Sequence, residues 1–447
     1  WGMWPAGHRL PNLLAHLGVV MLLYRFLLNL GTRGDVALAA GVVFALHPIH
    51  SENLFCAYFR RDSVAALCVL AGVMACRRWG IGTPFLTSPA AWASLLSLMV
   101  GLGFKEGAGL LLPLVWVHDR LGLHPGGGRP PATRYAPLAI ALLGYAALRL
   151  WVLPVQALPQ PSLAATWAGE LGVNLLTFPK SLVTYARLAV WPWPLVTNHG
   201  IAPAFAVEPG VLGGCLLLGG YAWLLLRTWR TQPLVAFGLV WMGLTYLPTA
   251  NLVPGLVAQR VAERYAYLPS VGAGLALAAW IARRPPERLQ RWRPALVVAL
   301  CGYVVITLMR GGEWRDAERL VALDISRDPG SYLARYNRGV QLHREGRLEE
   351  ARAAYRQALR VDPGGLMAHN NLGDVSLSLH DLETARAEFD WVRRHNPGEP
   401  GAYLNLGNVA LLSKQYRLAE AYYRQALALN PGFEDARAML EQVSHRR

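Results

Sequence analysis

The chain has 447 residues, of which 53% are hydrophobic and only 16% are charged, and its formal net charge is +15. This composition is too apolar and too poor in charge for a water-soluble protein of that length. Residues 1–312 hold 24 of the 43 Lys and Arg but only 9 of the 28 Asp and Glu, so the whole positive excess lies in the apolar part. Basic residues beside apolar segments orient them in a bilayer, so the charge predicts membrane lipid as a partner and argues against nucleic acid.

The apolar runs predict an all-α membrane domain over residues 1–312, with about ten helical spans. Several runs are shorter than the roughly 20 residues that a perpendicular span needs. We expect the runs at 36–47 and 107–118 either to extend into their flanks or to be broken helices beside a buried site. The ten runs are 10–30, 36–47, 62–76, 90–104, 107–118, 135–153, 211–226, 233–252, 265–282 and 294–310.

If each run crosses the membrane once, the arginine-rich connections all fall on one side, as the positive-inside rule requires of cytoplasmic loops. The opposite side receives the loops at 47–62, 105–106 and 248–264, together with the C-terminal tail. This alternation requires Trp167–Val190 to lie at the interface as an amphipathic helix. The arginines are Arg33, Arg77, Arg78, Arg120, Arg129, Arg134, Arg227, Arg230, Arg283, Arg284, Arg288, Arg291 and Arg293.

Residues 313–447 repeat with a period of 34, which is the tetratricopeptide period. We expect three helix pairs over about 330–363, 364–397 and 398–431, with Trp314–Ser326 as a docking helix before them. Such a stack binds an extended peptide or a protein partner, and a rigid spacer is the alternative interpretation. The spacing is kept by Pro329, Pro363, Pro397 and Pro431 and by Gly339, Gly373 and Gly407.

Charged side chains gather in the loops of the membrane domain that lie opposite the arginine-rich side. Charges near a bilayer are costly unless they are paired or functional, and guanidinium and ammonium groups suit a phosphate. We expect Arg60, Lys105 and Arg264 to converge on one lipid phosphate. The alternative is that they anchor the loops at the interface. The residues expected around them are His47, His50, Arg61, Asp62, Glu106 and Glu263.

Five motifs occur in a fixed order along the chain. They are Phe44-Ala-Leu-His-Pro-Ile-His-Ser-Glu with Arg60-Arg61-Asp62, Phe104-Lys105-Glu106, Leu188-Ala-Val-Trp-Pro-Trp-Pro-Leu, Glu263-Arg-Tyr-Ala-Tyr-Leu-Pro-Ser, and Glu313-Trp314-Arg315-Asp316 before the repeats. With these motifs the chain resembles the transmembrane and tetratricopeptide-repeat-containing O-mannosyltransferases and their bacterial relatives, which belong to the C-type glycosyltransferase superfamily.

The resemblance implies a polytopic glycosyltransferase domain, residues 1–312, followed by a tetratricopeptide α-solenoid, residues 313–447. It implies transfer of a sugar, expected to be mannose, from a polyprenyl or dolichyl phosphate to protein Ser or Thr hydroxyls on the non-cytoplasmic side, with the repeats recruiting the acceptor. A carboxylate would deprotonate the hydroxyl while cations stabilise the leaving phosphate. The family's acidic first loop would precede Trp1, so we interpret the chain as N-terminally incomplete and take Glu52 as the fallback base.

Three further expectations accompany this interpretation. We expect no cofactor besides the lipid-linked donor, and no metal, because His47 and His50 have no third ligand at a usable spacing. We expect a bacterial inner membrane with periplasmic repeats, and the endoplasmic reticulum membrane with lumenal repeats is the alternative. The functional alternative is a non-catalytic, membrane-anchored repeat scaffold for protein–protein interaction.

Overall fold

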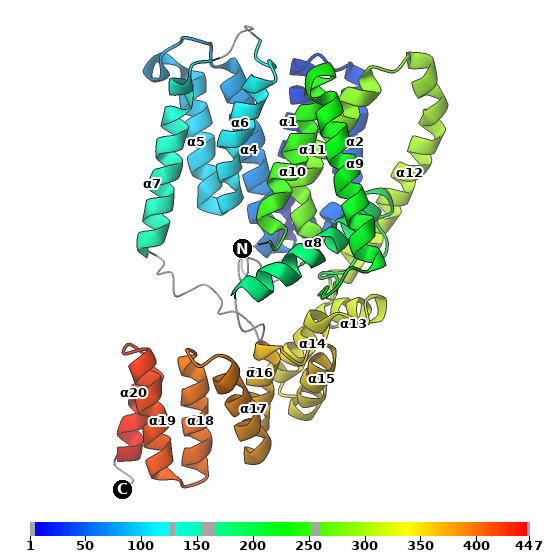
Figure 1. The fold of residues 1–447 in the computed structure, drawn as a ribbon. Helices are drawn as coiled ribbons and strands as arrows, with labels where there is room; N and C mark the ends of the chain where they lie inside the picture. The colour runs from blue at the N-terminus through cyan, green and yellow to red at the C-terminus, as the bar shows by residue number, and fades with distance from the viewer. Residues whose placement is uncertain (1–4, 126–129, 153–166, 202, 253–259, 445–447) are drawn as a thin grey trace. The chain divides into compact units, whose positions relative to one another are not determined.

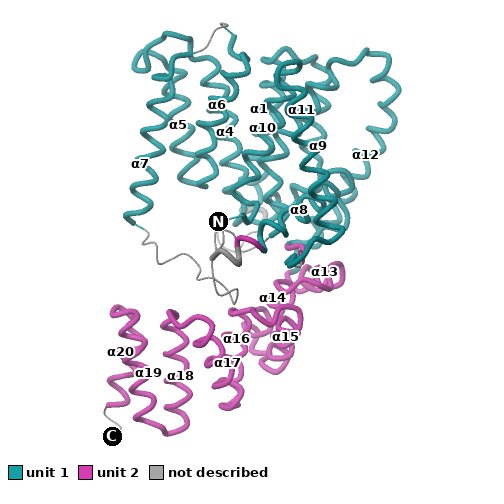
Figure 2. Tube along the Cα trace, viewed as in Figure 1, with its two compact units in different colours: residues 1–159, 173–197, 203–316 teal, residues 160–172, 198–202, 317–447 magenta. Residues whose placement is uncertain are grey.

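The computed structural model describes residues 5–125, 130–152, 167–201, 203–252 and 260–444. The described residues form α-helices and short 3-10 helices, and no strand occurs among them. They divide into two compact units, one of residues 1–159, 173–197 and 203–316 and the other of residues 160–172, 198–202 and 317–447 (Figure 2). The expected all-α fold, with apolar helices first and repeats last, is confirmed.

The first unit is a bundle of helices, and each of the ten apolar runs overlaps one of them (Figure 1). Its core is built from aliphatic and aromatic side chains of helices that are far apart in the chain, such as Leu23, Leu70 and Trp241. The helices are α1 (Pro5–Asn29), α2 (Gly34–Leu46), α4 (Arg60–Arg78), α5 (Pro89–Phe104), α6 (Leu111–Arg120), α7 (Ala136–Val152), α9 (Pro209–Thr231), α10 (Pro233–Tyr246), α11 (Tyr267–Ala282) and α12 (Pro286–Glu313).

The sequence predicts about ten membrane spans, but fewer of the described helices are both long and apolar enough to cross a membrane. Among the described residues, five helices are long and apolar enough to cross a membrane, and a bent pair makes a sixth. Helices α5 and α10 are apolar but shorter. The shortfall has a physical reason: a 3-10 turn follows α2 and α10 and precedes α6, so the apolar runs at these three helices are divided between two segments.

Both short runs singled out in the sequence are broken helices. Helix α2 ends at Leu46, and the chain resumes after His47 as a 3-10 turn and α3 (Ser51–Phe55), bent by 50°. Pro48 favours this break because proline disfavours a helical conformation in the residue before it. The second run is divided between a 3-10 turn, Glu106–Leu110, and α6.

The segment that the sequence predicts as an amphipathic helix is helical, as α8 (Trp167–Val190). Within the first unit, α8 runs at a steep angle to the other helices, at one end of the bundle (Figure 1). Its Tyr185 side chain exchanges hydrogen bonds with the backbone of Ala262, donating to the carbonyl at 3.0 Å and accepting from the N–H at 3.2 Å. Helix α8 therefore holds the segment that leads into α11.

Helices α10 and α11 pack backbone to backbone. A Cβ atom added at Gly238 would lie 2.4 Å from the backbone nitrogen of Ala276, and one added at Gly272 would lie 2.5 Å from that of Met242. Small residues at such a crossing are typical of membrane helix pairs, which gain their stability from close packing.

The second unit is a stack of three helix pairs between two single helices, α13 (Ala317–Arg327) and α20 (Glu434–Ser444). In each pair the glycine faces an aromatic ring of the second helix, because a Cβ there would lie 2.4–2.6 Å from Tyr355, Phe389 or Tyr423. The period of 34 thus places a ring against a glycine in every repeat. The pairs are α14 (Tyr332–Arg344) with α15 (Leu348–Val361), α16 (Leu366–Ser378) with α17 (Leu382–His395), and α18 (Pro400–Leu412) with α19 (Tyr416–Leu429).

Candidate functional site

The loops that carry the predicted phosphate-binding residues lie at one end of the bundle (Figure 1). They are the connection from α2 to α4, the turn between α5 and α6, and the connection from α10 to α11. The connections after α1, α4, α6, α9 and α11, which carry the basic residues, lie at the other end. Of those arginines, Arg129 lies outside the described residues.

Lys105 is placed by the break between α5 and the 3-10 turn that follows. Its backbone is extended, and its side chain forms an ion pair with Asp62 in the first turn of α4. Gly101 makes this approach possible, because a Cβ there would lie 2.7 Å from the Cβ of Ala108 and 3.1 Å from that of Cys68. Without a side chain at this position, α5 can lie close enough to α4 for the two charges to meet.

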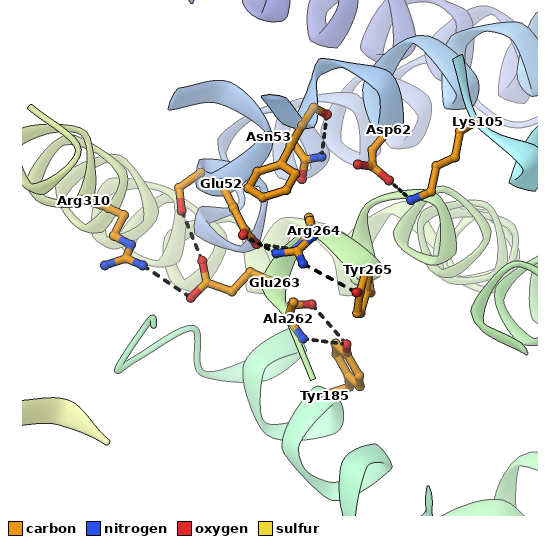
Figure 3. A network of polar contacts seen from close by, with 12 residues as sticks. Glu52, Asn53, Asp62, Lys105, Tyr185, Ala262, Glu263, Arg264, Tyr265 and Arg310 are labelled. Atoms are coloured by element: carbon orange, nitrogen blue, oxygen red, sulfur yellow. Dashed lines mark hydrogen bonds and ion pairs between the residues drawn. The ribbon is translucent and has the colours of Figure 1, made fainter. Parts of the chain in front are cut away.

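Arg264 is held by Glu52, which lies on the short helix α3 (Figure 3). The guanidinium Nη1 lies 2.6 Å from Glu52 Oε1, and the backbone N–H of Arg264 donates to Oε2 at 2.9 Å. The side chain of Glu52 is 1% exposed and that of Arg264 is 10% exposed. A carboxylate that is almost fully buried is thus paired through both of its oxygens, as burial of a charge demands.

The ring of Tyr265 lies beside both cations. The guanidinium carbon of Arg264 is 4.8 Å from the ring centroid, and the ammonium of Lys105 is 5.9 Å from it. The charges of Arg61 and Arg264 act electrostatically on Lys105, which places all three cations in one neighbourhood. With the carboxylates of Glu52, Asp62 and Glu106, and with the Arg149 that pairs with Glu106, the group holds four cations and three carboxylates, an excess of one positive charge. A local positive excess in a partly desolvated setting favours an anion.

Arg60 is tied to the same region by a different contact. Its Nε donates to Asn12 Oδ1 at 2.9 Å, while the Nδ2 of Asn12 donates to the carbonyls of Asn53 and Cys56 at 3.0 and 2.9 Å. Asn12 therefore joins α1, α3 and the start of α4 at one point. It is Arg61, the next residue, whose charge acts on Lys105.

Glu263 lies in a second buried network beside the Glu52–Arg264 pair. The hydroxyl of Ser51 donates to its Oε2 at 3.5 Å, and Nη2 of Arg310 lies 4.0 Å from its Oε1 (Figure 3). Arg310 also pairs with Glu313 at 2.7 Å, and its side chain is 1% exposed. The last helix of the unit, α12, is thus joined by charge to the turn that carries Arg264.

His47, His50 and Glu106 lie at this end of the bundle but make contacts of their own. His50 is buried and uses Nδ1 on the carbonyl of Phe44 and Nε2 on the hydroxyl of Ser270. His47 Nε2 bonds to the carbonyl of Ala189. Glu106 pairs with Arg149 of α7 at 2.7 Å, and its charge also acts on the adjacent Lys105. In the part of the chain that the structure describes, no group of three potential metal ligands gathers.

Three residues of this region were missed in the sequence. Tyr265 follows Arg264 directly, and the sequence gives no sign that its ring also lies near Lys105. Asn12 and Arg310 are polar residues within otherwise apolar helices. A polar or ionisable residue in an apolar span is a recognised signal of a paired or functional position, and this signal would have found both.

The repeats match two models of the tetratricopeptide repeat family, over residues 305–365 and 400–433. Among curated proteins, the chain is 25% identical to protein O-mannosyl-transferase Tmtc1 of Drosophila melanogaster, over 80% of this chain and 52% of that protein. Over most of its length the chain is therefore similar to the Tmtc-like, tetratricopeptide-repeat-containing proteins. This confirms the resemblance drawn from the motifs.

Two further relatives from the same organism fit this family. Tmtc3 is 24% identical over 80% of this chain and 46% of its own length. Tmtc2 is 33% identical over 29% of this chain and 14% of its own length. The chain therefore spans about half the length of the Tmtc1 and Tmtc3 relatives that it matches.

Proposed function

We propose that this chain is an integral membrane glycosyltransferase that takes a sugar, mannose by the relatives' names, from a polyprenyl phosphate and attaches it to protein Ser or Thr hydroxyls. The membrane character is supported by the five long apolar helices. The reaction class is supported by the relatives, which are named protein O-mannosyl-transferases. We place the reaction on the non-cytoplasmic side, because the arginine-rich connections lie at the opposite end of the bundle.

The observation that carries this proposal is the placement of Lys105 and Arg264 beside the ring of Tyr265, with the charge of Arg61 acting on Lys105. When a sugar leaves a lipid phosphate, negative charge grows on that phosphate. Fixed cations in a water-poor site stabilise such charge more in the transition state than in the ground state. Lys105 and Arg264 are the phosphate ligands that we propose, and Arg61 replaces Arg60 as the third because Arg60 bonds to Asn12.

Glu52 and Asp62 act in this proposal as positioning residues. Each forms an ion pair with one of the cations, so each fixes where a positive charge stands. Both carboxylate oxygens of Glu52 already accept hydrogen bonds from Arg264, and Asp62 already binds the ammonium of Lys105. We therefore assign neither residue to deprotonation of the acceptor hydroxyl.

The ion pairs of Glu52 with Arg264 and of Asp62 with Lys105 also favour a second candidate function. If the ion pairs only stabilise the loops, the membrane unit is an anchor and the repeats are a scaffold for protein partners. The two functions differ in one measurable property. A transferase binds a polyprenyl phosphate sugar through the cation cluster, and a scaffold has no use for one.

The experiment compares the unaltered chain with Lys105→Met in detergent micelles, using radiolabelled polyprenyl phosphate mannose. Both binding of the lipid and transfer of the label to a Ser/Thr-rich protein are measured. Lys180→Met is the matched control. Lys180 lies on α8 and, like Lys105, pairs with a carboxylate, in this case that of Glu208. We expect Lys105→Met to weaken binding by roughly tenfold or more, the value of one charge-assisted contact. Equal binding by all three proteins, without transfer, would establish the scaffold.

A further inference from the structure

The first helices of the three repeats form one face of the second unit, because α14, α16 and α18 contact one another across the intervening helices. Asp374 lies on α16, the middle helix of this face, and is partly buried. Its two carboxylate oxygens accept hydrogen bonds from the side-chain amides of Asn370, at 3.4 Å, and Asn405, at 3.3 Å. Two long amide contacts are weak compensation for a charge in this position.

Among the described residues, Asp374 differs from other carboxylates of the repeats in lacking a positively charged partner. Asp381 and Asp390 pair with arginines, at 3.4 and 2.7 Å. Asp374 forms no ion pair with any residue in the described part of the chain, although this unit is rich in arginine. The charged group that acts on it is His343. Burial raises the pKa of Asp374 to about 6, which is the mark of a charge that lacks a counterion.

We propose that Asp374 and Asn405 form a subsite for a lysine or arginine side chain of an extended protein segment. The cation would take the place of the missing counterion at Asp374. The Oδ1 atom of Asn405 accepts no hydrogen bond from the described residues, so it can receive a backbone N–H of the same segment. This inference rests on the proposed function in one respect: the segment belongs to the acceptor protein.

A cation fits this subsite better than the other classes of side chain. An acidic side chain would be repelled by the carboxylate, and an apolar one would desolvate Asp374 further without pairing it. A cationic side chain gains a charge-assisted hydrogen bond at a partly desolvated position, where such bonds are strong. The stacked first helices supply the long surface that an extended segment needs.

The test uses the full chain in detergent micelles and a synthetic library of 12-residue peptides in which every position is randomised. Bound peptides are sequenced and compared with the input library. We expect Lys and Arg to be enriched about tenfold at one position by the unaltered chain, and Asp374→Asn to abolish this enrichment. Glu383→Gln removes an exposed carboxylate from the neighbouring helix α17 and is expected to leave it intact.

Two results would overturn the inference: no enrichment of Lys or Arg by the unaltered chain, or the same enrichment by Asp374→Asn. Thermal unfolding of the variants confirms that they are folded, since Asn has nearly the shape of Asp. Sugar transfer to an enriched peptide is then measured separately. Transfer without a preference for Lys or Arg would contradict the subsite and leave the transferase standing, whereas the preference without transfer would contradict the transferase alone.

Discussion

Glu52 and Arg264 lie 212 positions apart in the chain and form a buried two-point contact, in which the guanidinium binds one carboxylate oxygen at 2.6 Å and the backbone N–H of Arg264 binds the other at 2.9 Å. The pair fixes both the charge of Arg264 and the course of the backbone beside it. The bent segment after α2 and the turn before α11 are therefore held in one geometry by a single carboxylate.

The variant Glu52→Gln keeps an oxygen for the backbone N–H but removes the charge. Removal of one partner from a buried ion pair typically costs about 3–5 kcal/mol, so we expect both stability and donor binding to fall, and transfer to fall with them. Binding and transfer are measured with radiolabelled polyprenyl phosphate mannose. The control is Glu208→Gln, whose carboxylate is 44% exposed. If Glu52→Gln bound the donor normally yet transferred roughly 10²–10⁴-fold more slowly, Glu52 would instead be the catalytic base.

Arg310 is expected to be essential for the stability of the membrane unit. Replacement by Met removes the cation between Glu263 and Glu313, whose side chains are 0% and 6% exposed. We expect a loss of about 3–5 kcal/mol, partly restored by Arg310→Lys. Thermal unfolding in detergent micelles is the measurement. Arg149→Met, which breaks a pair that is about half exposed, is the control and should cost less than about 1 kcal/mol. Equal losses in the two variants would contradict the prediction.

The crossing of α10 and α11 should not tolerate a single added methyl group. In Gly238→Ala the new Cβ would overlap the backbone of α11, at 2.4 Å from Ala276 N, so the helices must separate. Overpacking typically costs about 1–3 kcal/mol, and a rigid backbone neighbour favours the upper end. Gly219→Ala on α9 meets no atom within 4 Å and should gain roughly 0.5–1 kcal/mol from helix propensity. Unfolding by sodium dodecyl sulfate measures both, and a shift of the same sign would refute the packing argument.

The raised pKa of Asp374 predicts that the stability of the repeats depends on pH, and a single variant can isolate this effect. Its pKa is raised to about 6 in the folded chain, so between about pH 4 and 6 the folded state binds more protons than the unfolded state. Stability from this group therefore falls as the pH rises through 6 and is recovered on acidification. We expect Asp374→Asn to unfold a few degrees higher than the unaltered chain at pH 7.5, and this difference to shrink to roughly a third near pH 4.5, because the unfolded carboxyl, with a pKa of about 3.9, is still mostly ionised there.

Glu383→Gln, measured at the same two pH values, accounts for the general loss of one carboxylate. Its difference from the unaltered chain should be small at both. A difference for Asp374→Asn that grows on acidification would show that the carboxylate is stabilised in its charged form, opposite to the expectation.

The two sides of the membrane are tested with single cysteines in a background without the five native ones. Ser378 on α16 and Arg291 on α12 are both exposed. We expect an impermeant maleimide to label Ser378→Cys in intact bacterial spheroplasts, and Arg291→Cys only after lysis, since arginine-rich connections stay in the cytoplasm. Labelling of Arg291→Cys alone in intact spheroplasts would invert the proposed topology.

The sequence alone determined the features of this protein that repeat or persist over many residues. Apolar runs predicted every long helix of the membrane unit, because a run of apolar side chains must be buried or meet lipid. The period of 34 predicted the three helix pairs, because one repeat cannot bury its own apolar face. For the short runs at 36–47 and 107–118 the sequence left open whether they extend into their flanks or are broken helices, and the structure shows that both are broken.

The tertiary structure decided which charges meet. Asp62 with Lys105, Glu52 with Arg264 and Glu263 with Arg310 are pairs between loops and helices far apart in the chain, and many other pairings have the right charge. The choice depends on how closely helices approach at glycines such as Gly101, and that distance is a property of packing. For the same reason the structure ties Arg60 to Asn12, whereas the guanidinium of Arg61 lies over the ring of Tyr58 and its charge acts on Lys105, a difference between adjacent residues that composition and spacing do not contain.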